Sequence, residues 1–220
     1  MTGLVRPGEI VDLSHPLPNG APGYPGDPGL AVLTAHEHGE SGYHVSDIHI
    51  GSHVGTHIDV PLHVFDGGED VLGTDLHRLV GPARLIDLGA LPPFAEIGPD
   101  DVGPVRAGER IVLKTGWART FGTGEYHDAF PQLSVALAER LAVEGILLVG
   151  IEQPSVHHTD GLAVHRALLG AGVVIVEGMD LSGLDAAGGS DAAGFFLTCL
   201  PLPIESLDGC PVRAIATALP

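Results

Sequence analysis

Positively charged residues are scarce in this sequence. Its 220 residues include 10 Lys and Arg against 28 Asp and Glu, which gives a formal net charge of −18 at pH 7. Phosphate backbones and anionic membrane surfaces both attract proteins through Lys and Arg. The sequence therefore argues against a nucleic-acid partner and against binding to an anionic membrane.

Cysteines and long apolar runs are also scarce. Cys199 and Cys210 form no CxxC pair, and they predict reduced thiols in a cytoplasmic protein rather than a disulfide framework. No stretch reaches the roughly 18 consecutive apolar residues of a membrane span. The first residues, MTGLVRPGEIVDLSHPLP, lack the apolar core of a signal peptide. We therefore expect a soluble, cytoplasmic protein.

The rest of the composition is that of a globular chain rich in turns. Hydrophobic residues make up 44% of the sequence, with 32 Gly and 18 Pro, and no repeat or long linker divides it, so we expect one domain over residues 1–220. Compact apolar runs predict strands at 9–13, 30–36, 43–50, 84–88, 110–115, 146–151, 173–177, 195–204 and 211–217. Helical spacing predicts helices at 133–145, with Ser134 as N-cap and Gly145 as stop, and at 163–172. Helices that lead directly into strands predict an α/β domain with a mixed β-sheet.

The segment HVGTHIDVPLH, residues 53–63, alternates polar and apolar side chains. In an extended chain His53, His57, Asp59 and His63 would share one face, with the apolar residues against the core. A single histidine is more often an ordinary surface or core residue. Three histidines and one aspartate within this segment, however, are the side chains that bind divalent metals. The segment therefore predicts a metal site.

A straight strand would not bring these ligands to one ion. At about 3.3 Å per residue His53 and His57 would lie roughly 13 Å apart, whereas a shared ion needs both nitrogens within about 2.1 Å. Gly55 lies where a bend is easiest, because glycine adopts backbone angles that other residues avoid. The β-branched neighbours and Pro61 argue against a long helix. We expect a strand that leads into a tight turn.

Two later residues can add to this site. His165 lies in the second expected helix, and Glu177 ends the apolar run VVIVE. A carboxylate at the end of a buried strand is costly unless it is paired or coordinates a cation. Each residue alone is more typical of a structural role. Together with the first cluster they favour a larger metal centre.

These residues resemble a known family. HVGTHIDVPLH is similar to the signature HxGTHxDxPxH of the metal-dependent cyclase family, which includes bacterial kynurenine formamidase and isatin hydrolase. The resemblance covers most of the chain, from VDLSHPL and YPGDP through KTGW and VHRALLGAGVVIVEG to LPLPI and CPVRA. It implies a swivelling β/β/α type of domain, assembly as a homodimer or homotetramer, and a small-molecule substrate.

The resemblance also implies a centre of two divalent ions per chain, Zn²⁺ or Mn²⁺. His53, His57 and Asp59 would bind the first ion. Asp59 would bridge to the second ion, which His165 would also bind, and Glu177 would bridge the two ions. The choice between zinc and manganese stays open, because imidazole and carboxylate ligands accept both.

The implied activity is hydrolysis of the C–N bond of an aryl formamide such as N-formylkynurenine, by metal-activated water. His63, the last residue of the signature, would be the general acid/base. Tyr24, in YPGDP, stands where bacterial kynurenine formamidases generally have a tryptophan that contacts the substrate ring, and we expect it to bind the substrate. Glu152-Gln153 and His157-His158 lie in loops that either shape the pocket or form ordinary turns.

Two alternatives stay open. Because Tyr24 replaces the tryptophan, an isatin-type cyclic amide or a lactone is a second class of substrate within the same chemistry. A non-catalytic metal-binding protein is an alternative of a different kind. Structural zinc sites are usually closed and rich in cysteine, whereas this sequence offers mixed histidine and carboxylate ligands and leaves His63 over. That difference favours a catalytic centre.

Overall fold

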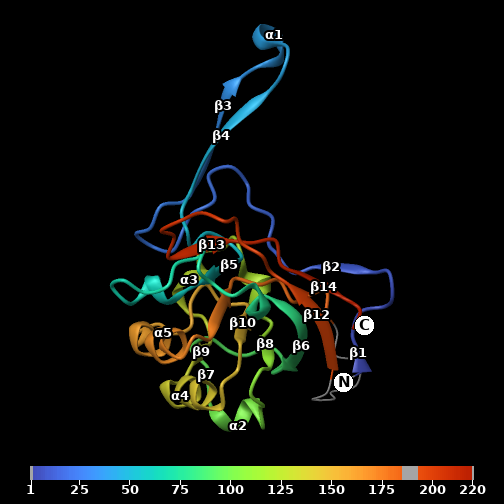
Figure 1. Cartoon of the computed structure of the whole chain (residues 1–220), viewed down its shortest axis with the longest axis vertical. Helices are drawn as coiled ribbons and strands as arrows, with labels where there is room; N and C mark the ends of the chain where they lie inside the picture. Colours follow the sequence, from blue (N-terminus) through green and yellow to red (C-terminus); the bar gives the residue numbers. More distant parts are fainter. Residues whose placement is uncertain (1, 185–192, 220) are drawn as a thin grey trace.

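The computed structural model describes residues 2–184 and 193–219 (Figure 1). A ten-stranded mixed sheet has the order β13-β5-β11-β10-β8-β6-β12-β14-β2, and β1 pairs with β12. Its strands are β1 (Thr2–Gly3), β2 (Ile10–Asp12), β5 (His57–Asp59), β6 (Val80–Asp87), β8 (Arg110–Lys114), β10 (Leu148–Ile151), β11 (Val174–Glu177), β12 (Ala193–Thr198), β13 (Gly209–Pro211) and β14 (Ile215–Thr217). The α/β domain with a mixed sheet that the sequence predicts is confirmed.

Parallel strands form the centre of this sheet. β6, β8, β10 and β11 pair in parallel in that spatial order, and β5 joins β11 in the antiparallel direction. All four residues of β10 and of β11 are buried, as their uninterrupted apolar sequences predict. Side chains alternate between two cores: Ile111 and Leu113 of β8 pack in one cluster and Val112 in the other. The sheet is thus covered on both faces.

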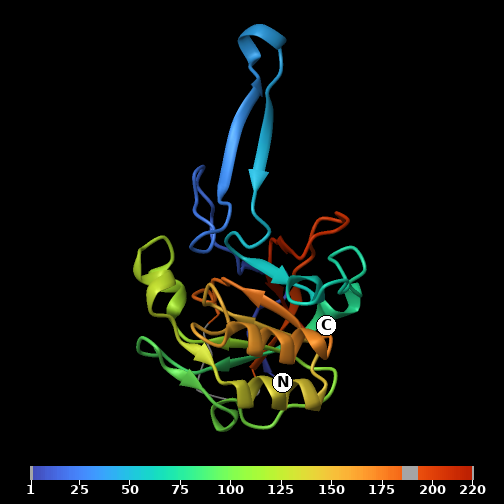
Figure 2. The same cartoon turned by 90° about the vertical axis from the view of Figure 1, so that its left-hand side faces the viewer.

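Two helices of ten residues cover one face, and the remaining helices are short (Figure 2). The α-helices are α1 (His38–Ser41), α2 (Pro99–Val102), α3 (Glu125–Asp128), α4 (Val135–Glu144) and α5 (Gly161–Gly170), and the 3₁₀ helices are η1 (Pro61–His63), η2 (Leu76–Arg78) and η3 (Trp117–Thr120). Leu137 of α4 and Leu168 of α5 pack in the cluster that contains Ile111. Within the described residues, every helix is too short or too polar to cross a membrane.

The caps of α4 agree with the sequence. The Ser134 hydroxyl accepts a hydrogen bond from the backbone N–H of Leu137 at 3.1 Å, which satisfies one of the N–H groups that a helix start leaves unpaired. Gly145 ends the helix in the left-handed conformation, with φ 70°. Both predicted ends of this helix are therefore confirmed.

Two predicted strands extend too far. The strand expected at 195–204 ends at Thr198, and the one expected at 211–217 is split into the end of β13 and a short β14. Pro201 and Pro203 lack the N–H that the first strand would need to continue, and Pro211 is the last residue of β13. The strand predicted at 195–204 was too long because it was based on apolar composition alone.

A long hairpin stands clear of the body. β3 (Leu30–His36) and β4 (Val45–Ile50) pair only with each other in the described part of the chain, and α1 closes their tip (Figures 1 and 2). We call residues 30–50 the arm. A second small sheet, formed by β7 (Glu96–Ile97) and β9 (Gln132–Leu133), lies within the body.

Glu152 holds the loop that follows β8. Its carboxylate is buried, and Oε2 accepts hydrogen bonds from the N–H of Thr115 at 2.7 Å, the hydroxyl of Thr115 at 3.0 Å and the N–H of Trp117 at 3.0 Å. Burial raises the pKa of Glu152, and the donors from Thr115 and Trp117 oppose that rise. The Tyr126 hydroxyl also donates to the backbone oxygen of Glu152 at 3.0 Å. Glu152 therefore stabilises the 115–126 loop.

Glu152→Ala should lower the free energy of unfolding by about 3 kcal/mol, because it leaves several buried donors without an acceptor. Glu152→Gln keeps one acceptor oxygen in place and should lose less than half as much. Urea denaturation of both variants measures the difference. Equal losses in the two variants would show that the negative charge of Glu152, rather than one acceptor oxygen in this place, stabilises the loop.

Candidate metal centre

Two neighbouring strands bring three of the predicted ligands together. β5 lies between β11 and β13, and in its pairing with β11 His57 is opposite Glu177 and Asp59 is opposite Ile175. Residues directly opposite each other in a sheet project from the same face. Ile175 belongs to the cluster beneath α4 and α5, so His57, Asp59 and Glu177 face the same side.

His165 completes this group from α5. The four side chains are almost fully enclosed, with exposed fractions of 2% for His57, 0% for Asp59, 6% for His165 and 3% for Glu177. His57 Nε2 lies 3.4 Å from Asp59 Oδ1 and 3.5 Å from Glu177 Oε2. His165 Nε2 lies 3.4 Å from Asp59 Oδ2 and 3.4 Å from Glu177 Oε1. Each carboxylate therefore turns one oxygen toward each imidazole.

These separations suit metal coordination. Ligand atoms about 2.1 Å from a tetrahedral ion lie roughly 3.4 Å from one another. His57 Nε2, Asp59 Oδ2 and Glu177 Oε1 are buried atoms without a hydrogen-bond partner. Burying such polar atoms unpaired is costly, and divalent cations would offer them partners. The donor set and its unpaired atoms therefore fit a metal ion.

The electrostatics of the group also favour a cation. Burial lowers the pKa of His57 and of His165, but the contacts with Asp59 and Glu177 outweigh burial and raise both values to about 10. Burial raises the pKa of Asp59, but contacts with His165, His53 and His57 hold it well below its usual value. Asp59 thus stays ionised and attracts positive charge. Protons on the imidazoles and metal ions compete for the same place.

His53 lies beside this group in a turn, not on the strand. The prediction that a bend joins His53 to His57 is confirmed, because Gly55 has φ 66°, but the bend precedes the strand, which begins at His57. A strand was expected to lead into this turn, but here the turn leads into the strand, and the 3₁₀ helix η1 follows and ends at His63. Val54, Ile58 and Val60 are fully buried, so the predicted apolar face is confirmed. His53 Nδ1 reaches Asp59 Oδ1 at 2.9 Å.

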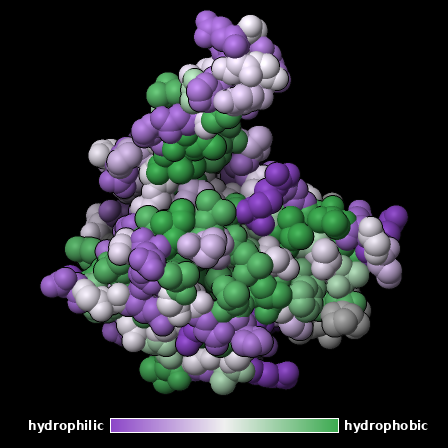
Figure 3. Space-filling model, turned by 45° about the horizontal axis from the view of Figure 1, so that its top comes forward, coloured by the Kyte–Doolittle hydropathy of each residue, from purple (hydrophilic) through white to green (hydrophobic). Residues whose placement is uncertain are grey.

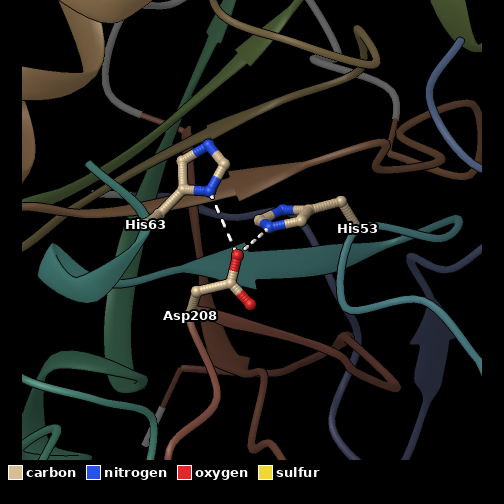
Figure 4. Close-up of side chains that lie close together, drawn as sticks. All are labelled: His53, His63 and Asp208. Carbon is tan, nitrogen blue, oxygen red and sulfur yellow. Dashed lines mark hydrogen bonds and ion pairs between the residues drawn. The ribbon is translucent and has the colours of Figure 1, made fainter. Parts of the chain in front are cut away.

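Asp208 is a member of the site that the sequence did not predict. One oxygen, Oδ2, lies 2.8 Å from His53 Nε2 and 3.3 Å from His63 Nδ1 (Figure 4). The ring of His63 is centred 4.3 Å from that of His53 and 5.1 Å from that of His165. An aspartate directly before the strand-like segment GCP was a weak signal, because nothing local in LDGCPVRA identifies its partners.

A cavity of about 460 Å³ opens over His53 and His57. Tyr24 lies in its wall, where it packs beside the aromatic cluster that contains Tyr126, and Phe121 lines the same space. The lining atoms are mainly apolar, as in pockets that enclose small organic molecules. The structure therefore places the predicted substrate-binding residue next to the predicted ligands.

The His157-His158 loop has a structural explanation. His157 Nδ1 accepts hydrogen bonds from the N–H groups of Thr159 at 3.1 Å and Asp160 at 2.9 Å, directly before α5. The ring of His158 stacks on Phe130, with centroids 3.9 Å apart. Among the described residues that line the cavity, neither of these histidines is present. They stabilise the approach to the helix that carries His165.

Comparison with known proteins agrees with these observations. The Cyclase family model matches residues 11–158. The kynurenine formamidase of Bacillus thuringiensis subsp. konkukian (strain 97-27) is 34% identical over 217 residues, covering 96% of this chain and 98% of that protein. The kynurenine formamidase of Bacillus cytotoxicus is 32% identical over 221 residues, covering 98% of this chain and 100% of that protein.

Solved structures have the same fold. One described as a predicted metal-dependent hydrolase from Bacillus stearothermophilus has a TM-score of 0.78 at 28% identity, covering 94% of this chain and 97% of that one. An isatin hydrolase bound to the product analogue thioisatinate has a TM-score of 0.80 at 22% identity, covering 96% and 92%. With its signature residues gathered around two buried carboxylates and its sequence matched over most of its length, the chain belongs to the cyclase family.

Proposed function

We propose that this protein is a metal-dependent hydrolase that cleaves the C–N bond of an aryl formamide such as N-formylkynurenine. The observation that carries the proposal is the group of two buried carboxylates and two buried imidazoles beside a mainly apolar cavity. The kynurenine formamidases that are 34% identical over nearly the whole chain support this class of substrate.

The proposed metal centre holds two divalent ions, zinc or manganese. His53, His57 and Asp59 would hold the first, while Asp59 and His165 would hold the second, with Glu177 bridging both. When bound, such ions lower the pKa of water toward 7 and polarise a carbonyl oxygen. The unpaired buried atoms of His57, Asp59 and Glu177 support this assignment.

The other residues of the site would bind the substrate and move protons. The apolar cavity accepts the aryl ring, with Tyr24 in its wall. His63 Nδ1–H donates a hydrogen bond to Asp208, which leaves Nε2 to take a proton from the attacking water. His63 then returns that proton to the leaving nitrogen as the C–N bond breaks, giving formate and an aryl amine.

A cyclic amide of the isatin type is the second candidate substrate. The same bond class is cleaved, and the ring fits an aromatic-walled cavity of about 460 Å³. The isatin hydrolase named above shares the fold. Tyr24 stands in the place of a tryptophan and so changes the cavity wall that the substrate ring would contact. This change is the reason to test a cyclic amide as well.

Hydrolysis of N-formylkynurenine and isatin, measured side by side with zinc- and manganese-loaded protein, tests the function. We expect turnover of N-formylkynurenine, and a loss of about 10²- to 10⁴-fold in kcat for His63→Ala with metal content unchanged, because a general base is removed. His77→Ala, an exposed histidine outside the site, is the control and should match the wild type.

Faster cleavage of isatin than of the formamide would assign the second substrate class. If neither compound is cleaved while the ions remain bound, the protein is a metal-binding protein or acts on another substrate. Full activity of His63→Ala would contradict the proposed proton transfer.

We also propose that the chain forms a homodimer or homotetramer through its arm. Leu30 pairs with Ile50 and Val32 with Ile48 on one face of the arm, and Ile48 and Ile50 are 62% and 41% exposed. Figure 3 shows apolar side chains along the arm and on the body beneath it. An isolated two-stranded hairpin is marginally stable in water, so a surface that covers this face would stabilise it.

We propose that a second copy of the chain covers the apolar face of the arm. The loop 199–208 exposes Leu200, Leu202 and Ile204 at the same end of the body from which the arm rises (Figure 1). Two apolar surfaces at one end can cover each other in a symmetric pair, since a two-fold axis lets each copy offer both.

Ile48→Asp should convert the oligomer to a monomer, because it places a charge in an apolar interface. Light scattering coupled to size-exclusion chromatography measures the mass. Val143→Asp, which adds the same charge at an 88% exposed position on α4, should leave the mass unchanged. A monomeric wild type, or an oligomer that survives Ile48→Asp, would contradict this assembly.

A further inference from the structure

We propose that Asp208 is a positioning residue that fixes the orientation of the general base His63 and of the metal ligand His53 at the same time. The proposal rests on the function proposed above. Neither the signature HVGTHIDVPLH nor the other matched motifs assign a role to this aspartate, which lies 145 residues after His63 and 155 after His53.

The geometry joins both histidines to one atom. Asp208 Oδ2 lies 2.8 Å from His53 Nε2 and 3.3 Å from His63 Nδ1, so one carboxylate oxygen lies between the two rings (Figure 4). The side chains are partly enclosed, at 14% exposed for His53, 28% for His63 and 38% for Asp208. Partial enclosure reduces screening by water and makes such contacts more directional.

The contacts determine which ring nitrogens carry hydrogen. Asp208 Oδ2 contacts one nitrogen of each ring, and an aspartate is ordinarily ionised at neutral pH. An ionised carboxylate only accepts hydrogen bonds, so His53 Nε2 and His63 Nδ1 are the donors. The lone pair of neutral His53 is then on Nδ1, and that of neutral His63 is on Nε2.

For His53 this tautomer suits metal binding. Its Nδ1 lies 2.9 Å from Asp59 Oδ1. A lone pair that close to a carboxylate oxygen is favourable only when a proton or a cation lies between them. A metal-binding histidine commonly donates its other N–H to a carboxylate, which orients the ring and makes the ligand more basic. Asp208 occupies that place for His53.

For His63 the same tautomer suits proton transfer. With Nδ1 tied to Asp208, Nε2 is the nitrogen that remains to accept a proton. A ring nitrogen of His63 lies in one group with donor atoms of Asp59 and His165, all within 4.8 Å of one another. A buried aspartate that holds a catalytic imidazole in one tautomer is a recurring arrangement in hydrolases.

The backbone holds Asp208 in this place. Its carbonyl oxygen accepts the N–H of Val60 at 3.2 Å, and the next residue, Gly209, pairs with Asp59 across β13 and β5. A Cβ on Gly209 would lie 2.7 Å from His53 Cε1 and 2.8 Å from the backbone oxygen of Ile58. Only glycine lets the strand approach this closely, so the position of Asp208 is set by the sheet rather than by a free loop.

The test compares Asp208→Asn and Asp208→Ala with Glu205→Gln, an exposed carboxylate in the same loop. Zinc affinity, measured by competition with a chelator, should fall about 10- to 100-fold in both Asp208 variants and stay unchanged in the control. In the loaded enzymes kcat for N-formylkynurenine should fall about 10- to 100-fold, with KM changed less than threefold.

A double variant separates positioning from general damage. If Asp208 acts through His63, adding Asp208→Asn to His63→Ala should lower kcat by less than threefold, while the loss of zinc affinity persists. A further loss as large as in the wild-type background would overturn the link to His63. The number of ions per chain should stay the same in Asp208→Asn, and loss of one ion would make Asp208 a ligand and overturn the positioning role.

The outcomes also separate this proposal from the proposed function. If the wild type cleaves no formamide and Asp208→Asn still binds zinc more weakly, the substrate assignment fails and the role of Asp208 toward His53 stands. If the wild type is active, and zinc affinity and kcat in Asp208→Asn both stay within threefold of wild type, the proposal is wrong. Asp208→Asn keeps the side-chain shape, so the test does not depend on the folding of Asp208→Ala.

Discussion

The site depends on two carboxylates, Asp59 and Glu177, that are buried on one face of a mixed sheet. Charges in such a place need partners, and each carboxylate faces His57 and His165 at 3.4 or 3.5 Å. The pairing of β5 with β11 fixes the carboxylates, and α5 brings His165 over them. The same need for positive charge that raises the pKa of both imidazoles to about 10 also suits divalent cations.

The other parts of the proposed site are arranged around Asp59 and Glu177. The apolar cavity opens over His53 and His57, so a ring held there would present its amide beside the carboxylates. His63 stands at the same edge and is tied to Asp208, which contacts His53 as well. The proposed metal ligands, the proposed proton carrier and the cavity wall therefore come from segments that meet only in the folded sheet.

Much of this site was predictable from the sequence, because the residues concerned lie close together in the chain. The segment 53–63 contains most of the proposed ligands, the bend at Gly55 and a buried apolar face in consecutive residues, and Glu177 ends an apolar strand. Asp208 was not predictable, because its contacts depend on the pairing of β13 with β5. The strands of the arm followed from their composition, but no local pattern shows that a hairpin lacks a packing partner.

Anomalous diffraction from crystals grown with zinc, recorded on both sides of the zinc absorption edge, is the most direct test of the metal centre. We expect peaks between Asp59 and Glu177, each within about 2.1 Å of a histidine nitrogen. An empty space between the two carboxylates, with zinc bound instead to the exposed histidines of the arm, would contradict the assignment of this site.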